Sequence, residues 1–557
     1  MSENQSEREK VAETAPGAST RRELFQMGGV LALPVLLGSM EVKAATGPLT
    51  PGPQIYQSIG VEPVINCRGT FTIIGASVEL PEVRAAMDAA SKHFVQLDEL
   101  AEAVGRRLAE LTGAEWGMVS AGCAAGLKHV TAACVAGGNP EKLLRIPDLT
   151  GLDKTEVIIP RSSRNEYDHA IRNVGVKIVM VNTAEELEHA INSKTAMIYL
   201  VTGGASNSGP LSLENVVKIA KPYNIPVLLD AADEVLTIPN VHLQKGATIV
   251  AYSGGKAICG PQCAGMMLGR KDILQSAWQA SSPHHGPGRD NKVGREETVG
   301  MVAAVEAWVK RDHKAEWTKW LSYLDTISKR VSSVDSVKTT VREPTQLSNQ
   351  SPTLTVSWDP SKLFITGEEL GEMVARSKPR IALAAGGGNR GGGGNAETTS
   401  VTITAWMMQA GEDKIVGDRL YDILTQKRSA KSTALAPPAT NISGRWDVDV
   451  EFFSSKSRHT LVLEQNGNQL QGTHKGDFTV RDVFGTIEGD QIKLRSVERS
   501  MPGDNISFTF SGSVSGGGFS GPIHLGEYLT AKYTAKKYVY PAQQGTILVP
   551  AGPPLSN

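Results

Sequence analysis

The stretch that most constrains the fold is residues 248–270, in which two apolar runs bracket a glycine-rich turn carrying one lysine, Lys256. Apolar runs of this length bounded by glycines are typical of buried strands, so we predict strands at 250–252 and 264–268. Lys256 then lies on a tight loop between two core strands. Desolvation there favours the neutral amine, a nucleophile that can form a Schiff base, although lysines also occupy such loops without a catalytic role.

A second apolar run, residues 225–230, lies upstream of this turn and ends in the carboxylate of Asp230. Taken alone, an aspartate at this position is more often a helix cap or a turn residue. Followed by a lysine in a glycine-rich turn, it suits an enzyme that uses pyridoxal phosphate. The Asp230 carboxylate would keep the pyridine nitrogen protonated, and Lys256 would bind the aldehyde.

Residues 118–127 predict a site for the phosphate group. They read as a short strand, a turn of small residues and the start of an alanine-rich helix. The free N–H groups near Gly122, Cys123 and Ala124, together with the positive end of the helix dipole, would face the anion. Ser253 could add a hydroxyl group from the other side. The alternative is a close-packed corner between a strand and a helix.

A polar cluster follows the strand predicted at 157–160. Loops at strand ends are where α/β proteins build their sites, so Tyr167 or His169 could stack on or touch the pyridine ring. Arg164 could bind an acidic substrate, and Arg289, farther along the chain, is a candidate for anion binding. Each residue also has a plain alternative, either a solvated helix start or a surface salt bridge.

The motifs between about residues 65 and 424 together resemble the bacterial selenocysteine synthase family, L-seryl-tRNA(Sec) selenium transferase, and relatives similar to D-glucosaminate-6-phosphate ammonia lyase. The matching motifs are Ile65-Asn66 with Gly69, and residues 111–115, 120–127, 227–230, 252–256 with 260–262, and 289–292. The resemblance implies a fold-type I pyridoxal-phosphate enzyme with Lys256 as the internal aldimine and Asp230 as the partner of the ring nitrogen. Within the matching motifs, Asn66, Gln262 and Arg289 are expected to contact the substrate.

Three departures from the transferase pattern weaken the case for selenium transfer more than the case for pyridoxal chemistry. The segment that ends in Leu-Gly-Arg-Ala in the transferase is 74–77 here and contains no arginine. Gly255 stands where the transferase commonly has an aspartate. Gly286 occupies the position of one of the transferase's downstream active-site arginines. The net charge of −1 and the pI near 6.9 give no electrostatic signature for nucleic acid either.

The first 45 residues resemble a twin-arginine export signal. Arg21 and Arg22 precede an apolar run at 28–38 and a small-residue site near Ala44 or Ala45. The run is short for a membrane span, so we expect no stable span after signal removal and a periplasmic location. An uncleaved amphipathic amino-terminus is the alternative.

The length of 557 residues predicts several domains. Alternating strands and helices indicate a mostly parallel α/β sheet, with a long helix near 298–324 leading to a smaller α/β domain. After a linker the pattern changes to period two, which indicates an antiparallel barrel or sandwich. The predicted segments are 1–45 (signal), 46–325 (pyridoxal-phosphate-binding large domain with an N-terminal segment), 326–425 (small domain), 426–440 (linker), 441–540 (β domain) and 541–557 (tail).

The five cysteines show no zinc spacing, so we predict buried free thiols and no metal site. The favoured function is α,β-elimination or β-replacement on a small amino-acid substrate, carried out through the Lys256 aldimine by a homodimer or larger oligomer. Two alternatives stay open at this point. One is L-seryl-tRNA(Sec) selenium transfer, and the other is a non-catalytic relative that uses the fold for binding.

Overall fold

The computed structural model describes residues 48–385, 398–430, 434–498, 504, 506–540, 545 and 552. The predicted export signal and the glycine-rich insertion at 386–394, which the sequence suggests is a mobile loop, lie outside these residues. Among the described residues, no helix combines the length and the apolar character needed to cross a bilayer.

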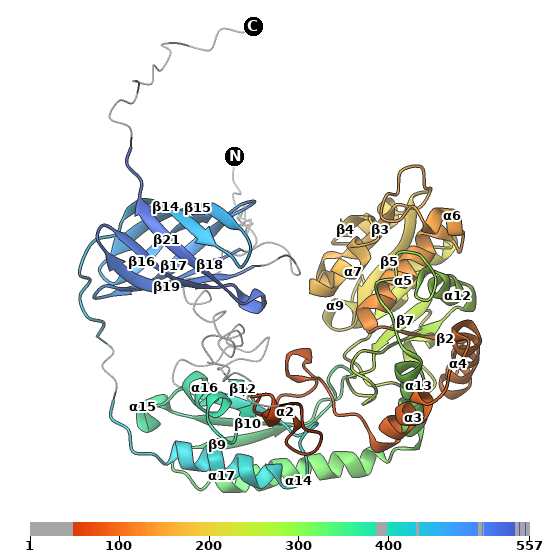
Figure 1. Ribbon diagram of the computed structural model, residues 1–557, viewed down its shortest axis with the longest axis horizontal. Helices are drawn as coiled ribbons and strands as arrows, with labels where there is room; N and C mark the ends of the chain where they lie inside the picture. The colour runs from red at the N-terminus through yellow and green to blue at the C-terminus, as the bar shows by residue number, and fades with distance from the viewer. Residues whose placement is uncertain are drawn as a thin grey trace, which may run out of the picture.

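The large domain is built on a seven-stranded sheet in the order β2-β8-β7-β6-β5-β3-β4 (Figure 1). Neighbouring strands from β4 through β7 are parallel, whereas β8 is antiparallel to both β7 and β2. The strands are β2 (Trp116–Ser120), β3 (Glu156–Pro160), β4 (Lys177–Val181), β5 (Thr195–Val201), β6 (Val227–Asp230), β7 (Ile249–Ser253) and β8 (Gly265–Gly269).

Both faces of this sheet are buried, which explains why its strands read as continuous apolar runs. In β3, Ile158 belongs to the core on one face, while Val157 and Ile159 belong to the core on the other. The first face is covered by α4, α10 and α13 and the second by α5 and α12. These helices are α4 (Leu97–Thr112), α5 (Cys123–Ala136), α10 (Leu213–Ala220), α12 (Lys271–Ala280) and α13 (Arg295–Lys310).

The single long helix predicted near 298–324 is wrong, because the structure has two helices there, α13 and α14 (His313–Val331). The break has a local cause. Arg311 is extended and donates to the carbonyls of Ala257 and Ile258 at 3.3 and 2.8 Å, on the loop that carries Lys256. Asp312 then caps α14 by accepting from the backbone N–H of Ala315 at 2.9 Å.

The small domain has a four-stranded antiparallel sheet in the order β12-β13-β10-β9, packed on α14, α16 and α17. The N-terminal strand β1 (Ile65–Asn66) crosses to this domain and pairs with β11 (Ile381–Ala382) in parallel. The other elements are β9 (Lys338–Arg342), β10 (Thr353–Trp358), β12 (Ala384–Ala385), β13 (Thr399–Thr404), α16 (Gly367–Arg376) and α17 (Glu412–Leu424).

The C-terminal β domain is a closed eight-stranded antiparallel barrel, since β14 pairs with both β15 and β21. Closure leaves no free sheet edge. Trp446, Phe510 and Phe519 lie in its buried core. The strands are β14 (Gly444–Glu451), β15 (Lys456–Asn466), β16 (Gln469–Lys475), β17 (Val480–Glu488), β18 (Gln491–Val497), β19 (Phe508–Ser515), β20 (Gly518–His524) and β21 (Thr530–Lys537).

Asp504, between β18 and β19, links the C-terminal domain to the large domain. Asp504 accepts from Arg164 at 3.0 Å and from Arg172 at 2.9 Å. Both arginines also bind Asp168, whose side chain is fully buried. The four side chains form a cluster of alternating charge at the end of β3.

Candidate functional site

The candidate site lies at the edge of the large sheet where the parallel strands end. Ser120, Asp230 and Ser253 are the last residues of β2, β6 and β7. Because β8 runs back antiparallel to β7, the loop between them also lies at this edge, and that loop carries Lys256. Carboxyl ends of strands are where α/β sheets place ligands.

The loop around Lys256 is tightly closed by backbone hydrogen bonds. The N–H of Gly254 donates to Ala264 at 2.9 Å and the N–H of Gly260 donates to Gly254 at 2.8 Å. A Cβ atom on Gly255 would lie 2.7 Å from the Cα of Gln262. This packing leaves no room for the aspartate that the transferase pattern has at this position.

Asp230 is buried, with 5% of its surface exposed, and its carboxylate is hydrogen-bonded on both oxygens. Oδ2 accepts from the Tyr199 hydroxyl at 2.9 Å, and Oδ1 accepts from the Ala232 N–H at 3.0 Å. Burial raises the pKa of Asp230, while these two hydrogen bonds and the charge of Lys256 act in the opposite direction. The half-buried Lys256 is therefore within electrostatic reach of the carboxylate.

Cys123, the first residue of α5, lies beside Asp230. Its Sγ is 3.8 Å from Oδ1 of Asp230. Burial raises the pKa of the Cys123 thiol well above its ordinary value, and the charge of Asp230 adds to that effect. The thiol is therefore protonated at neutral pH, which argues against a nucleophilic role.

The amino end of α5 offers backbone donors at the same edge. Gly122 caps the helix in a positive-φ conformation (φ 83°). Within the described part of the chain, the N–H groups of Cys123 and Ala124 have no acceptor. Gly265 allows this end to lie close to β8, because a Cβ there would be 2.5 Å from the N of Cys123. Ser253 is the strand partner of Gly265, so it is at the same end of the sheet.

The three residues predicted after β3 have different surroundings. Arg164 is buried, and it forms ion pairs with the carboxylates of Asp168 and Asp504. Tyr167 is 55% exposed, and the charge of Asp230 contributes to raising its pKa, after burial and Glu166. His169 begins α7 (His169–Arg172) and is exposed. Of the three, Tyr167 is the one that the structure connects with Asp230.

The remaining predicted substrate residues make local contacts. Asn66 holds its own turn, since Oδ1 accepts from the N–H groups of Arg68 and Gly69 at 2.9 and 3.1 Å. The amide nitrogen of Gln262 donates to Thr72 at 3.4 Å. The exposed Arg289 donates to the Ser282 hydroxyl at 3.0 Å.

Tyr199 is the site residue that the sequence reasoning missed. It is fully buried in β5, and its strand pairs with β6 so that Val201 lies opposite Asp230. A tyrosine in an otherwise apolar central strand is a usable signal, because a buried hydroxyl group needs a polar partner.

All five cysteines are free, and Cys263 is exposed, so the prediction of buried thiols is wrong for that residue. Among the described residues, no three His, Cys, Asp or Glu side chains gather closely enough to hold a metal ion.

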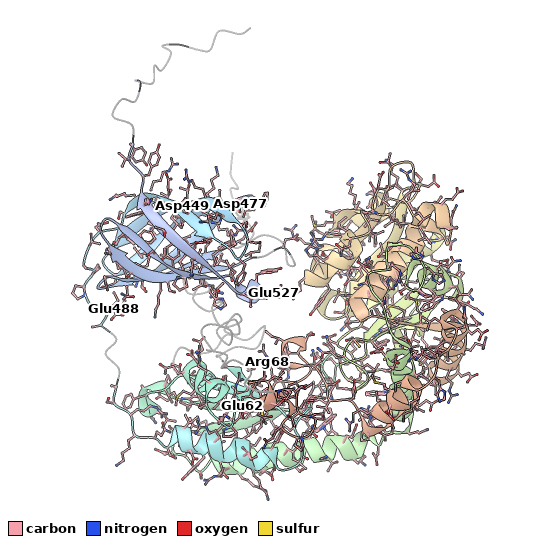
Figure 2. The ribbon with its side chains drawn as sticks, in the orientation of Figure 1. Glu62, Arg68, Asp449, Asp477, Glu488 and Glu527 are labelled. Atoms are coloured by element: carbon pink, nitrogen blue, oxygen red, sulfur yellow. The ribbon has the colours of Figure 1, made fainter. Side chains whose placement is uncertain are left out.

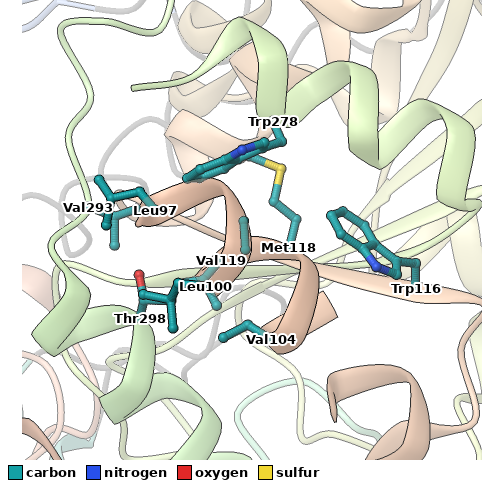
Figure 3. A pocket seen from close by; sticks show the side chains of 10 residues that line it. Leu97, Leu100, Val104, Trp116, Met118, Val119, Trp278, Val293 and Thr298 are labelled. Atoms are coloured by element: carbon teal, nitrogen blue, oxygen red, sulfur yellow. The ribbon is translucent and has the colours of Figure 1, made fainter. Parts of the chain in front are cut away.

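A small apolar cavity of about 10 Å³ lies where α4, β2, α12 and α13 meet, between Trp116 and Trp278 (Figure 3). It could hold at most about one water and includes neither Lys256 nor Asp230, so it is a packing void.

Three polar groups at the sheet edge thus match three of the polar parts of pyridoxal phosphate, namely its phosphate, ring nitrogen and aldehyde. The free N–H groups of α5 suit the phosphate. The buried carboxylate of Asp230 suits the pyridine nitrogen, and the amine of Lys256 suits the aldehyde.

Comparison with known proteins agrees with this match. The family model for class-V aminotransferases matches residues 164–298. The D-glucosaminate-6-phosphate ammonia lyase of Salmonella typhimurium is 32% identical over 292 residues, which cover 51% of this chain and 76% of the relative. The 5'-C-glycyluridine monooxygenase-decarboxylase of a Streptomyces species is 30% identical over 309 residues, which cover 52% of this chain and 76% of that relative. The L-seryl-tRNA(Sec) selenium transferase of Mannheimia succiniciproducens is 28% identical over 256 residues, which cover 39% of this chain and 51% of that relative.

The solved structure of D-glucosaminate-6-phosphate ammonia-lyase superposes with a TM-score of 0.58 at 26% identity. The match covers 67% of this chain and 99% of that structure. The predicted fold class, a fold-type I large and small domain with an added antiparallel β domain, is confirmed. The dependence on pyridoxal phosphate follows from the same relatives. This chain belongs to the class-V aminotransferase family of pyridoxal-phosphate-dependent enzymes.

Proposed function

We propose that this enzyme removes the Cα proton of an amino acid and then eliminates or replaces a substituent at Cβ. The observation that carries the proposal is the convergence of Asp230, Lys256 and the amino end of α5 at one edge of the sheet. The relative that supports elimination is the ammonia lyase, which shares 32% identity across three quarters of its length.

Each of these groups has a defined task in the proposed reaction. Pyridoxal phosphate, when bound, supplies an electron sink for the negative charge that develops at Cα. The carboxylate of Asp230 holds a proton on the ring nitrogen, and Tyr199 keeps that carboxylate oriented. The α5 N–H groups and the Ser253 hydroxyl would hold the phosphate. The Lys256 amine would hold the aldehyde group and is the residue assigned to accept the Cα proton of the substrate.

Lys256 is half-buried, and the carboxylate of Asp230 is among the charged groups near it. Arg311 fixes the carbonyls of Ala257 and Ile258, so the residues directly after the lysine are held by the α13–α14 junction. The amine is thereby presented on a constrained loop.

The first experiment identifies the lysine. Purified protein is mixed with pyridoxal phosphate, reduced with borohydride and digested, and the modified peptide is found by mass spectrometry. We expect the label on Lys256, and we expect Lys256→Ala to lose both the label and the absorption band of the bound cofactor. Lys271→Ala, at a half-exposed position of α12, is the matched control and should keep both. A label on another lysine would reject the assignment.

The second experiment identifies the reaction class. A panel of D- and L-amino acids is incubated with the loaded enzyme in D2O, and Cα exchange is followed by NMR together with released ammonia and keto acid. Exchange with ammonia release supports elimination, and exchange without release points to racemisation or replacement. Tight, salt-dependent binding of seryl-tRNA would instead support selenium transfer.

We also infer that the chain is exported already folded through the twin-arginine route, which allows cofactor loading in the cytoplasm. Arg21 and Arg22 before the apolar run support this inference. Cell fractionation of a tagged chain tests it, since replacing both arginines by lysine should retain the protein in the cytoplasm. A periplasmic double variant would contradict it.

We infer further that the enzyme works as a homodimer or a larger oligomer. Phe94, between α3 (Pro81–Ser91) and α4, is 95% exposed and Val95 is 50% exposed, and side chains of this kind are favoured at subunit interfaces. Light scattering after size-exclusion chromatography measures the mass. A Phe94→Ser variant should shift the mass toward the monomer, and a wild-type monomer would refute the inference.

A further inference from the structure

Arg68 lies at the centre of a rigid turn that joins the two domains of the enzyme. Its neighbour Cys67 is fully buried and forms backbone hydrogen bonds with Ala382 at 2.8 Å and Thr404 at 2.9 Å, both in the small domain. Asn66 accepts from the Arg68 N–H at 2.9 Å. Gly69 follows in a positive-φ conformation (φ 97°), which glycine adopts without strain. The backbone of Arg68 is thus fixed on both sides.

The guanidinium group of Arg68 has no acidic partner among the residues that the structure describes. Its central carbon lies 4.3 Å from the centroid of the Phe71 ring, and its Nε is buried without a hydrogen-bond acceptor. Burial lowers the pKa of Arg68 to about 10, and no neighbouring carboxylate acts against that shift. A half-buried cation of this kind is costly unless an anion is supplied from outside.

Arg68 is also close to the lysine loop, as the backbone shows. Phe71, on which the guanidinium lies, accepts from the N–H of Ala76 at 3.0 Å. The next residue, Ser77, donates to the carbonyl of Gly255 at 2.9 Å, and Gly255 directly precedes Lys256. In Figure 2, Arg68 lies on the side of the small domain that faces the barrel.

The two arginines that the sequence predicts to bind anions, Arg164 and Arg289, are in less suitable places. Arg164 is already paired with Asp168 and Asp504. Arg289 is exposed and donates to a serine. Arg68 alone among these three combines a fixed backbone, partial burial and a side chain without a described carboxylate partner.

We propose that Arg68 is the receptor for an acidic group of the substrate, either a carboxylate or a phosphate, in addition to the groups at Cα. The planar guanidinium presents two parallel donors that match such an oxyanion, and Phe71 holds the plane in place. The substrate class is then an amino acid with an anionic side chain. This proposal rests on the proposed function, since it concerns the substrate of the same site.

The test compares acidic and neutral amino acids that differ little in shape. The loaded enzyme is titrated with glutamate against glutamine and with phosphoserine against serine, in both configurations, and binding is followed by the change in cofactor absorption. The first pair probes a carboxylate and the second a phosphate. Arg68→Gln and Arg68→Lys are compared with Arg84→Gln, an exposed arginine of α3.

We expect the wild type to bind the acidic member of at least one pair about 10- to 100-fold more tightly than the neutral member. Arg68→Gln should bring this ratio close to one without weakening the neutral ligand, Arg68→Lys should restore part of it, and Arg84→Gln should leave it unchanged. Equal affinities in the wild type, or an unchanged ratio in Arg68→Gln, would overturn the proposal.

Failure of this proposal can be told apart from failure of the proposed function. Cofactor labelling of Lys256 is measured before any amino acid is added, so it reports only on the site itself. If Arg68→Gln unfolds at a lower temperature, the Arg68→Lys variant, which keeps the charge but not the planar fork, supplies the comparison.

Discussion

Replacing Tyr199 with phenylalanine tests how the protein controls the carboxylate that is assigned to the pyridine nitrogen. The change removes one hydroxyl group, which donates to Oδ2 of Asp230 at 2.9 Å, and keeps the volume of the ring. A hydrogen bond to a charged group contributes about 1.5–3 kcal/mol. Since one pKa unit corresponds to about 1.4 kcal/mol, the pKa of Asp230, already raised by burial, should rise by about one to two further units.

The sign of the effect on cofactor binding follows from this shift. The ring nitrogen needs the ionised carboxylate, so affinity for pyridoxal phosphate is lost as the pH falls through the pKa of Asp230. In Tyr199→Phe this loss should begin about one to two pH units higher than in the wild type. The apoprotein should respond in the opposite sense, because a buried acid with a raised pKa makes the fold less stable as the pH rises through that range.

The assay is a titration of apoprotein with pyridoxal phosphate, followed by absorption, at intervals from pH 5 to pH 9. Tyr252→Phe is a matched control, because Tyr252 is also buried and its hydroxyl accepts from Asn240 at 2.7 Å. That variant loses one buried hydrogen bond but does not touch Asp230. An equal shift in both variants, or none in Tyr199→Phe, would refute the assigned role of Tyr199.

Two further predictions concern packing and the barrel. Gly265→Ala should destabilise the fold by about 1–3 kcal/mol and weaken cofactor binding, because the new Cβ would be 2.5 Å from the N of Cys123. The control is Gly286→Ala, whose new Cβ would have its nearest neighbour 3.6 Å away and which should change neither property. Urea unfolding measures the stability, and cofactor titration measures the binding. His474 in the barrel has a pKa lowered to about 3 by burial and by its neighbour His459, so its contribution to stability is present above pH 6.5 and lost as the pH falls. Hydrogen exchange of barrel peptides in urea should show the barrel about 2 kcal/mol less stable at pH 5 than at pH 8, and His474→Gln should flatten that dependence.

The parts of the site that follow from local sequence could be predicted. The strands that end at Asp230 and Ser253, and the helix that begins at Cys123, are each marked by an apolar run followed by a turn of small residues. Runs of that kind report burial on both faces of a sheet, which is a local property. Once three such ends are recognised in one parallel sheet, their meeting at a common edge is a consequence of the topology.

The parts that depend on contacts between distant segments could not be predicted in this way. Arg164 reads as a free cation at a strand end, but its partner Asp504 lies in another domain. The break between α13 and α14 depends on Arg311 reaching the carbonyls after Lys256, a contact that helical periodicity does not reveal. Arg68 received no assignment, because nothing local shows that it is half-buried without an acidic partner.

The position of Lys256 shows how one strand direction can decide the chemistry. Parallel strands are joined by crossovers of a dozen or more residues, usually through a helix, which return the chain to the opposite edge of the sheet. β8 instead pairs antiparallel to β7, so the chain turns directly and the whole loop stays at the edge where Asp230 ends β6. The same geometry explains the glycines around Lys256. A Cβ atom on Gly254 would lie 2.8 Å from the backbone oxygens of both Ala264 and Pro261. A parallel β8 would therefore separate the amine from the carboxylate even if every side chain of the motif were kept.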